Sequence, residues 1–220
     1  MINPDHPTNI LDLPERIPVF PLQGAMLLPR GRLPLNIFEA RYLAMVRDAF
    51  AHGRLIAMIQ PNEDDSEQYE PAIYPMGCLG RIAEFSETGD GRYVITLLGV
   101  CRFNVIEEIS RDTPYRQVLA DYGPFAADIL PVDQSQGGFD RNKLEECLRA
   151  YVEKLGLSAD WSQARKASDD DLVTALSMML PFGPSEKQAL LEAPDLMARA
   201  DVLTALLQMA TADDSETPVQ

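Results

Sequence analysis

One long stretch of alternating residues restricts the folds open to this chain more than any other feature of its sequence. Within the stretch from Arg92 to Ile109, apolar side chains recur at every second position from Tyr93 to Val105, with one interruption at Gly99. Alternation with a period of two is typical of a β-strand, and a strand this long bends, most often at an internal glycine. The stretch therefore favours a small closed or half-closed barrel over a flat sheet.

The residues around this stretch predict further strands. Asp90 and Gly91 separate it from an apolar run at 76–85, and this residue pair is typical of a two-residue hairpin turn. Shorter runs at 55–60 and 115–122 have the length and composition of strands. The first half of the chain is thus expected to be mainly β-structure.

A helix and a turn are expected before these strands. Asn36 is suited to cap a helix with Glu39 in the third helical position of a capping box, and Gly53 is suited to end that helix. Ahead of it, Pro29 and Gly31 fit the second and fourth positions of a type I turn. The prolines and glycines of this apolar region are therefore predicted to separate short strands from the helix.

The hydrophobic period changes in the second half of the chain. Beyond a linker rich in proline and glycine, apolar residues recur every three to four positions, as they do in amphipathic helices. Ser168 with Asp171, and Ser185 with Gln188, have the spacing of capping boxes. The predicted fold class is α+β. Its expected parts are a flexible tail at 1–14, a β pseudo-barrel with one inserted helix at 15–123, a linker at 124–138, an α-helical bundle at 139–210 and a disordered tail at 211–220.

Charge and cysteine content argue against several classes of function. The formal net charge is −15 and both halves are acidic, so we do not expect a nucleic-acid partner, because such binding depends on cations that displace counterions. Cys78, Cys101 and Cys147 are too few and too widely spaced for a disulfide framework. No apolar stretch has the length of a membrane span and the first residues lack a signal-peptide pattern. A cytoplasmic protein without a membrane partner is the simplest expectation.

Four segments of the chain carry a resemblance to a known family. In order they read IPVFPLQGAMLLPRGRLPLNIFEARYLAMV at 17–46, MGCLGRIAEF at 76–85, GRYVITLLGVCRFNV at 91–105 and EKQALLEAPDLMARADVLTALLQ at 186–208. Together they resemble the amino-terminal substrate-binding domain of the Lon ATP-dependent proteases, in the stand-alone form found in bacteria. The resemblance implies a PUA-like pseudo-barrel followed by a helical bundle. It also implies recognition of unfolded or damaged proteins, with a protease as a further partner.

The family's catalytic chemistry is not expected here. The chain ends at residue 220 and contains no GxxxxGK[ST] loop to bind phosphates, so neither ATP hydrolysis nor proteolysis is carried over from the full Lon enzymes. His6 lies in the predicted tail, and His52 closes the predicted helix, where a cation suits the helix dipole. No serine stands in a GxSxG motif. We therefore expect no catalytic residue.

Metal and cofactor sites are not expected either. The acidic run at 63–70 has carboxylates for Ca²⁺, but it lacks the glycine and the oxygen spacing of an EF-hand and is typical of a solvated loop. Cys101 and Cys147 fall on core-facing positions and are predicted to be small apolar fillers. Gly77 and Gly80 are too sparse for a dinucleotide-binding motif.

The candidate binding residues lie in the kinked apolar segment and at the single tryptophan. Core packing is the simpler role for each of them. An irregular segment that bears methionine and does not bury every side chain would instead leave an apolar patch for peptides, and an exposed tryptophan would anchor a partner. The candidate peptide contacts are Phe20, Leu22, Met26, Leu27, Leu28 and Trp161.

The leading hypothesis is a non-enzymatic module that binds exposed apolar segments of unfolded proteins in protein quality control. RNA binding is an alternative from a different class, because PUA-like folds often serve it elsewhere, although a fold alone is weak evidence for a function. A hydrolase is a further alternative, and it would require a pocket with convergent titratable groups.

Overall fold

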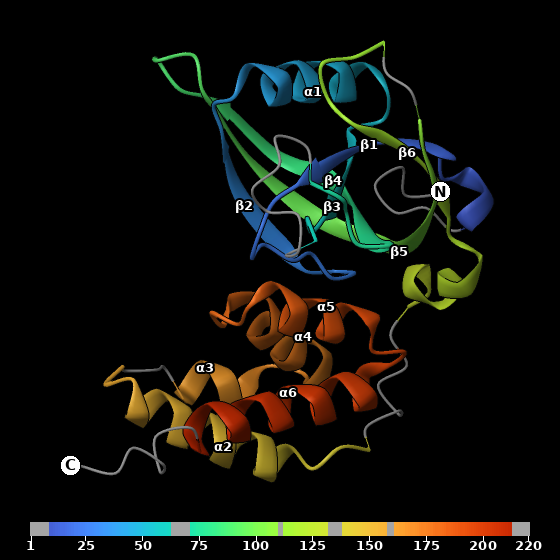
Figure 1. Ribbon diagram of the computed structural model, residues 1–220. Helices are drawn as coiled ribbons and strands as arrows, with labels where there is room; N and C mark the ends of the chain where they lie inside the picture. The colour runs from blue at the N-terminus through green and yellow to red at the C-terminus, as the bar shows by residue number, and fades with distance from the viewer. Residues whose placement is uncertain (1–8, 63–70, 110–111, 132–137, 158–160, 213–220) are drawn as a thin grey trace. The chain divides into compact units, whose positions relative to one another are not determined.

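The computed structural model describes residues 9–62, 71–109, 112–131, 138–157 and 161–212 (Figure 1). Contacts divide the chain into two units. The barrel unit comprises Met1–Pro131 with Pro181–Leu191, and the helical unit comprises Val132–Leu180 with Glu192–Gln220. Each unit is described by itself below.

The barrel unit contains a mixed sheet closed on itself. Its elements are η1 (Ile10–Asp12), β1 (Arg16–Pro21), β2 (Arg32–Ile37), α1 (Ala40–Ala51), β3 (Leu55–Ile59), β4 (Met76–Glu87), β5 (Tyr93–Ile109), β6 (Gln117–Asp121) and η3 (Gly123–Ile129). The six strands follow the order β2-β5-β4-β3-β1-β6, and β5 also pairs with β6. Only β1 and β3 run parallel among these pairs. The predicted α+β class and the barrel with one inserted helix are confirmed.

The long strand β5 closes the barrel because its first and last parts pair with different strands. Its first half, from Tyr93 to Leu98, pairs with β2, and its last part, from Asn104 to Ile109, pairs with β6. The pairing with β4 shifts register between Leu79 and Gly80, opposite the predicted bend. Such shifts increase local twist and bend a strand, which is how a sheet of this size curls into a barrel.

Gly99 lies at the bend of β5, and the segment 28–31 crosses the strand at this residue. Its amide donates to the carbonyl oxygen of Gly31 at 2.8 Å, and its own carbonyl accepts from the amide of Arg30 at 2.8 Å. A Cβ atom at this position would overlap the carbonyl group of Leu28. The close approach of two backbones therefore requires glycine here.

The turn before this crossing differs in type from the prediction. The amide of Gly31 donates to the carbonyl of Leu28 at 2.9 Å, which closes a turn around Pro29 as expected. Arg30 has a φ of +66°, however, and a positive φ at the third position is typical of a type II turn rather than type I.

Helix α1 begins later than predicted because β2 continues through the predicted cap. Asn36 lies in β2 opposite Val94, and the helix is capped at Glu39, whose side chain makes no capping hydrogen bond. The predicted capping box is therefore wrong. Pro34 also belongs to β2, at an edge of the sheet, where a strand tolerates a missing donor. The helix ends as predicted before Gly53, whose φ is +84°.

The β4–β5 hairpin is confirmed, but its loop is longer than predicted. The amide of Thr88 donates to the carbonyl of Arg92 at 2.9 Å, and the amide of Gly91 donates to the carbonyl of Thr88 at 3.0 Å. Gly91 has a φ of +79°. This is a three-residue loop in which a turn is followed by a left-handed glycine, rather than a two-residue turn at Asp90 and Gly91.

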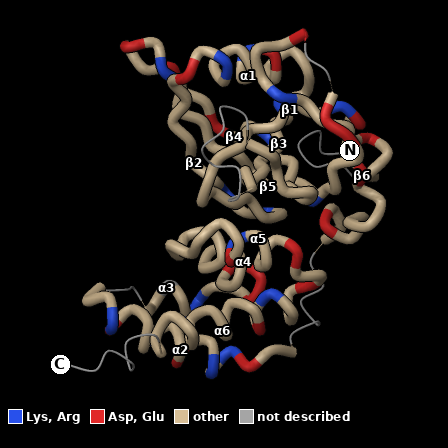
Figure 2. The backbone as a smooth tube through the Cα atoms, viewed as in Figure 1, with Lys and Arg blue, Asp and Glu red and all other residues tan. Residues whose placement is uncertain are grey.

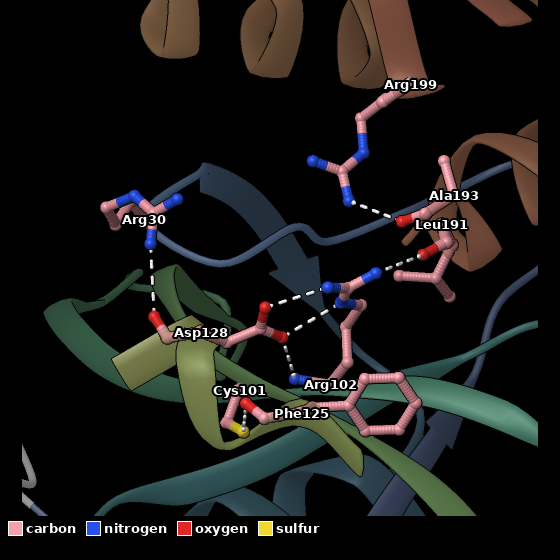
Figure 3. Close-up of polar contacts among 8 residues, drawn as sticks. All are labelled: Arg30, Cys101, Arg102, Phe125, Asp128, Leu191, Ala193 and Arg199. Atoms are coloured by element: carbon pink, nitrogen blue, oxygen red, sulfur yellow. Dashed lines mark hydrogen bonds and ion pairs between the residues drawn. The ribbon is translucent and has the colours of Figure 1, made fainter. Parts of the chain in front are cut away.

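A buried ion pair fixes η3 to the barrel, in a part of the chain predicted to be linker (Figure 3). Arg102 Nε and Nη2 donate to the two carboxylate oxygens of Asp128 at 2.9 and 2.8 Å, and the Arg102 amide also donates to this carboxylate at 3.0 Å. Only 6% of the Arg102 side chain and 9% of the Asp128 side chain are exposed. Burial by itself lowers the pKa of Arg102, but the hydrogen bonds and charge of Asp128 outweigh burial and raise it.

Helix α5 (Pro184–Glu192) belongs largely to the barrel unit, although its sequence pattern grouped it with the other helices. Gln60 Nε2 donates to the carbonyl of Pro184 at 2.9 Å, and Gln188 Nε2 donates to the carbonyl of Met76 at 3.3 Å. The helix is capped by the Glu186 carboxylate, which accepts from the amide of Gly183 at 2.7 Å. The predicted capping box of Ser185 with Gln188 is wrong, because the helix already begins at Pro184 and Ser185 is therefore not its N-cap residue.

The helical unit is built from the remaining helices, and α2, α4 and α6 bury apolar residues. They are α2 (Arg141–Lys154), α3 (Trp161–Lys166), α4 (Asp169–Met179) and α6 (Leu196–Ala212). Leu144 of α2 and Leu203 of α6 are fully buried. The predicted cap of α4 is confirmed, because the amide of Asp171 donates to Ser168 Oγ at 3.1 Å. Within the described ranges, no helix has the length and apolar character needed to cross a membrane.

Candidate functional site

The kinked apolar segment is buried and does not form the exposed patch that the sequence left open as an alternative to core packing. Phe20, Met26, Leu27 and Leu28 are between 0 and 6% exposed. The turn that follows folds the segment back over the sheet, where the Leu27 side chain packs against Gly80. These four side chains therefore belong to the core, the simpler of the two roles, and a role for them in peptide binding stays a prediction.

The other two candidate contacts are partly buried and lie in different units. Leu22 is in the barrel unit, where its amide donates to the carbonyl of Ile59 at 3.1 Å. Trp161 begins α3 in the helical unit, and the Arg149 guanidinium carbon lies 4.3 Å from the centre of its ring. This contact attaches the tryptophan to α2 and is typical of a cation–π interaction.

Two of the cysteines are buried in the core, and the described histidine contacts a backbone carbonyl at the end of a helix. Burial raises the pKa of the Cys101 thiol to about 12, and it raises the pKa of Cys78 well above its usual value. Both thiols are thus neutral and buried, while Cys147 is partly buried. His52 lies at the end of α1 with Nδ1 2.8 Å from the carbonyl oxygen of Asp48.

Some sequence predictions lie outside the described residues. These include His6, the acidic run at 63–70, most of the linker and the last residues of the chain. Residues 9–14, placed in the tail by prediction, form η1 and contribute Leu13 to the core. Among the described residues, no group of three or more His, Cys, Asp or Glu side chains is arranged to hold a metal ion.

Several exposed apolar side chains of the barrel unit gather around the β4–β5 hairpin, while others, such as Leu11 and Ile106, lie in other parts of the unit. Phe85 of β4 is 44% exposed and Val94 of β5 is 42% exposed, and Phe38 next to β2 is 62% exposed. The Phe85 ring meets the Phe50 ring edge to face at 4.8 Å and lies 5.1 Å from the ring of Tyr93. The three rings join α1 to both strands of the hairpin, and they hold Phe85 in place while leaving part of it exposed.

The strand β4 has a free edge beside these rings. Strand β3 pairs with β4 only as far as Arg81, which lies opposite Leu55. Beyond it, the amide of Ile82 donates to the carbonyl of Arg54 at 2.8 Å, and β4 continues to Glu87 with β5 on its other side. In the part of the chain that is described, residues 82–87 have no strand partner on the β3 side. Such an edge is able to accept an added strand.

A cleft opens between this edge and the C-terminal end of α1. It has a volume of about 590 Å³. The residues that line it are Phe50, Gly53, Arg54, Arg81, Ile82, Ala83 and Leu98. None of these side chains is a nucleophile or a general base, so the cleft offers a binding surface. We call it, together with the free edge at 82–87 and Phe85, the edge cleft.

Two arginines line the cleft itself, whereas the free edge carries the carboxylates of Glu84 and Glu87. The exposed Arg54 has a φ of +61°, and its guanidinium carbon lies 5.3 Å from the centre of the Phe50 ring. Arg81 Nη1 donates to the carbonyl of Gly53 at 3.1 Å, whereas its buried Nε has no hydrogen-bond partner. Neither arginine forms an ion pair with a described residue.

The carboxylates of Glu84 and Asp48 have hydrogen-bond partners of their own. Glu84 accepts from Thr96 Oγ1 at 2.8 Å and from Arg32 Nη2 at 2.6 Å, and these contacts lower its pKa, the threonine contributing most. The carboxylate of Asp48, on α1, accepts from the Tyr115 hydroxyl at 2.7 Å. Figure 2 shows acidic and basic residues interspersed along the barrel unit, so the positive charge of Arg54 and Arg81 is a local feature of the cleft lining.

Sequence reasoning missed the edge cleft for identifiable reasons. Phe85 ends an apolar run and reads as a core residue, because a run of that length predicts a buried strand. Arg54 and Arg81 are isolated charges that belong to no motif. The only available signal was the difference in length between the runs at 55–60 and 76–85, which implies that the longer strand extends past its neighbour.

Comparisons with known proteins agree with this architecture. Residues 16–209 match the family model for the ATP-dependent protease La (LON) substrate-binding domain. Lon protease 2 of Myxococcus xanthus is 25% identical over 197 residues, covering 89% of this chain and 24% of that protein. Lon protease of Flavobacterium johnsoniae is 30% identical over 193 residues, covering 86% of this chain and 23% of that protein. The chain thus spans about a quarter of the length of these curated relatives.

Solved structures support the fold. The Lon N-terminal domain protein from Xanthomonas campestris aligns with a TM-score of 0.57 at 24% identity, covering 86% of this chain and 97% of that one. The N-terminal domain of Mycobacterium avium complex Lon protease aligns with a TM-score of 0.58 at 15% identity, covering 88% and 98%. Since the family model extends over both units described above, the chain belongs to the ATP-dependent protease La (LON) substrate-binding domain family.

Proposed function

We propose that this chain recognises substrates for proteolysis by binding extended apolar segments of unfolded proteins, and that the edge cleft is the contact surface. The family is described as a substrate-binding domain, and the relatives that match are Lon proteases. We extend the proposal to protein quality control, in which a bound segment is passed to an ATP-dependent protease. The observation that carries it is the free edge of β4 beside the exposed ring of Phe85.

An unfolded chain suits this surface because its backbone donors and acceptors are unpaired. An extended segment added along residues 82–87 would form backbone hydrogen bonds that depend little on its sequence. Its apolar side chains would contact Phe85 and the rim of the cleft, and a folded protein would offer neither the free backbone nor the apolar side chains. The surface therefore favours unfolded over folded proteins without reading a specific motif.

The other sheet edge is less suited to the same role. Strand β2 also has no strand on its outer side among the described residues, but it contains Pro34, which lacks an amide donor. Residues 82–87 contain no proline. For the RNA-binding and hydrolase alternatives, the described residues supply no specific observation in favour.

The test is the capture of a reduced and alkylated model protein that is unable to refold. Replacing Phe85 with serine is expected to weaken binding about tenfold, because exposed aromatic anchors at binding surfaces typically contribute more than about 1.4 kcal/mol. The matched control is Ile106→Ser on β5, which removes an apolar side chain that is 65% exposed. Affinity is measured by fluorescence anisotropy after circular dichroism has verified that both variants fold.

Two results would argue against the proposal. Binding that is unchanged in Phe85→Ser would remove the edge cleft as the contact surface. An equal loss in Ile106→Ser would show that capture follows general surface apolarity rather than this site.

A further inference from the structure

Contacts with apolar side chains do not account for the two arginines that line the cleft, Arg54 and Arg81. Arg81 is held in place by the carbonyl of Gly53, yet its Nε is buried without a hydrogen-bond partner. A buried donor without a partner costs free energy, of the order of 1–3 kcal/mol. Because that atom is enclosed by protein, a carboxylate in the cleft would pair with the charged guanidinium group of Arg81 as a whole and offset part of this cost.

Arg54 points to the same kind of ligand. Its backbone adopts a left-handed conformation, which is uncommon for a residue other than glycine, and its side chain is placed over the Phe50 ring. The guanidinium is thus held beside an aromatic surface with its donors available. By contrast, Arg47 of α1 donates from Nε to the Tyr93 hydroxyl at 2.9 Å and is engaged within the unit.

From this geometry, and resting on the proposed function, we infer that the edge cleft selects extended segments in which a carboxylate side chain lies close to an aromatic one. The carboxylate binds Arg81 and Arg54, and the aromatic side chain packs on Phe85 and Phe50. Side chains two positions apart on an extended segment point to the same side, so one segment can present both groups to the cleft. The class of substrate is therefore an unfolded segment with both acidic and aromatic residues.

The acidic character of the chain as a whole does not oppose this selection. The net charge is −15, but charges separated by more than about 8 Å are largely screened at physiological ionic strength. Arg54 and Arg81 carry the charge of the cleft lining, and the carboxylates of Glu84 and Asp48 are engaged with other partners. Glu87, the last residue of β4, is not among the residues that line the cleft. Short-range attraction therefore decides which segment stays bound.

The experiment compares two short fluorescein-labelled peptides of alternating serine, phenylalanine and glutamate, identical except that glutamine replaces glutamate in the second. On the unmodified full chain, the glutamate peptide is expected to bind about tenfold more tightly, as charge-assisted hydrogen bonds contribute more than neutral ones. This preference is expected to disappear in Arg81→Gln and to persist in Arg16→Gln, a control that removes an exposed arginine at the start of β1. If Arg81→Gln does not fold, the same loss of preference for the glutamate peptide is expected in Arg54→Gln, which changes an exposed residue.

The outcomes separate this inference from the proposed function. Equal affinity for the two peptides, or the same preference in Arg81→Gln and Arg16→Gln, would overturn the selection for carboxylates. If the reduced and alkylated protein still binds through Phe85 in that case, the proposed function stands alone. If neither peptide nor the unfolded protein binds, both fail.

Discussion

Replacing Gly99 with valine is expected to lower the free energy of unfolding by at least about 3 kcal/mol. The side chain would overlap the carbonyl group of Leu28, and neither backbone is free to move. Gly99 is hydrogen-bonded to Gly31 and Arg30 on one side and lies opposite Gly80 of β4 on the other. Since small domains have about 5–15 kcal/mol of stability in total, the variant is expected to be largely unfolded at moderate denaturant concentrations.

Chemical denaturation followed by circular dichroism measures this effect. The matched control is Gly89→Val in the hairpin loop, where an added Cβ meets nothing within 4 Å. We expect the control to change the free energy of unfolding by no more than about 0.5 kcal/mol. Equal unfolding midpoints for the two variants would contradict the close contact between residues 28–31 and Gly99 of β5.

Changing Asp128 to asparagine is expected to destabilise the barrel unit by about 3–5 kcal/mol. The substitution keeps the shape of the side chain but removes the negative charge that accepts two hydrogen bonds from the buried Arg102 guanidinium. That guanidinium also donates to the carbonyl of Leu191 at 3.3 Å and lies 5.0 Å from the Phe125 ring. The cost therefore arises from the loss of a buried ion pair between Arg102 and Asp128.

An exposed ion pair provides the control for this variant. Glu84→Gln breaks the bond to Arg32, in which the side chains are 64% and 54% exposed. Such pairs typically contribute about 0.2–1 kcal/mol, so the control is expected to be nearly as stable as the parent. The interpretation fails if Asp128→Asn unfolds at the same denaturant concentration as Glu84→Gln.

Much of the barrel could be predicted because its pattern is local. The alternation from Tyr93 to Val105 and the hairpin before it determine two long strands, and Gly99 locates the bend. The start of α1 was missed because Asn36 and Glu39 have the spacing of a capping box, whereas Asn36 lies in the edge strand β2. Helix α5 was grouped with the other helices because helical spacing does not reveal which surface a helix packs against.

The site was harder to predict because it arises from relations between distant segments. Whether Met26 and Leu27 are exposed depends on the crossing over β5, which no local pattern contains. The free edge exists because β3 stops opposite Arg81 while β4 continues, and the cleft forms only where α1 ends beside that edge. A lone Phe85 carries no signal of these relations in the sequence.

The central claim is that unfolded protein binds along residues 82–87, and amide hydrogen exchange measures this directly. With a reduced and alkylated model protein bound, exchange is expected to slow across 82–87, while β2, the other edge of the same sheet, is expected to be unchanged. Slower exchange confined to β2 or to the helical unit, with residues 82–87 unaffected, would contradict the account.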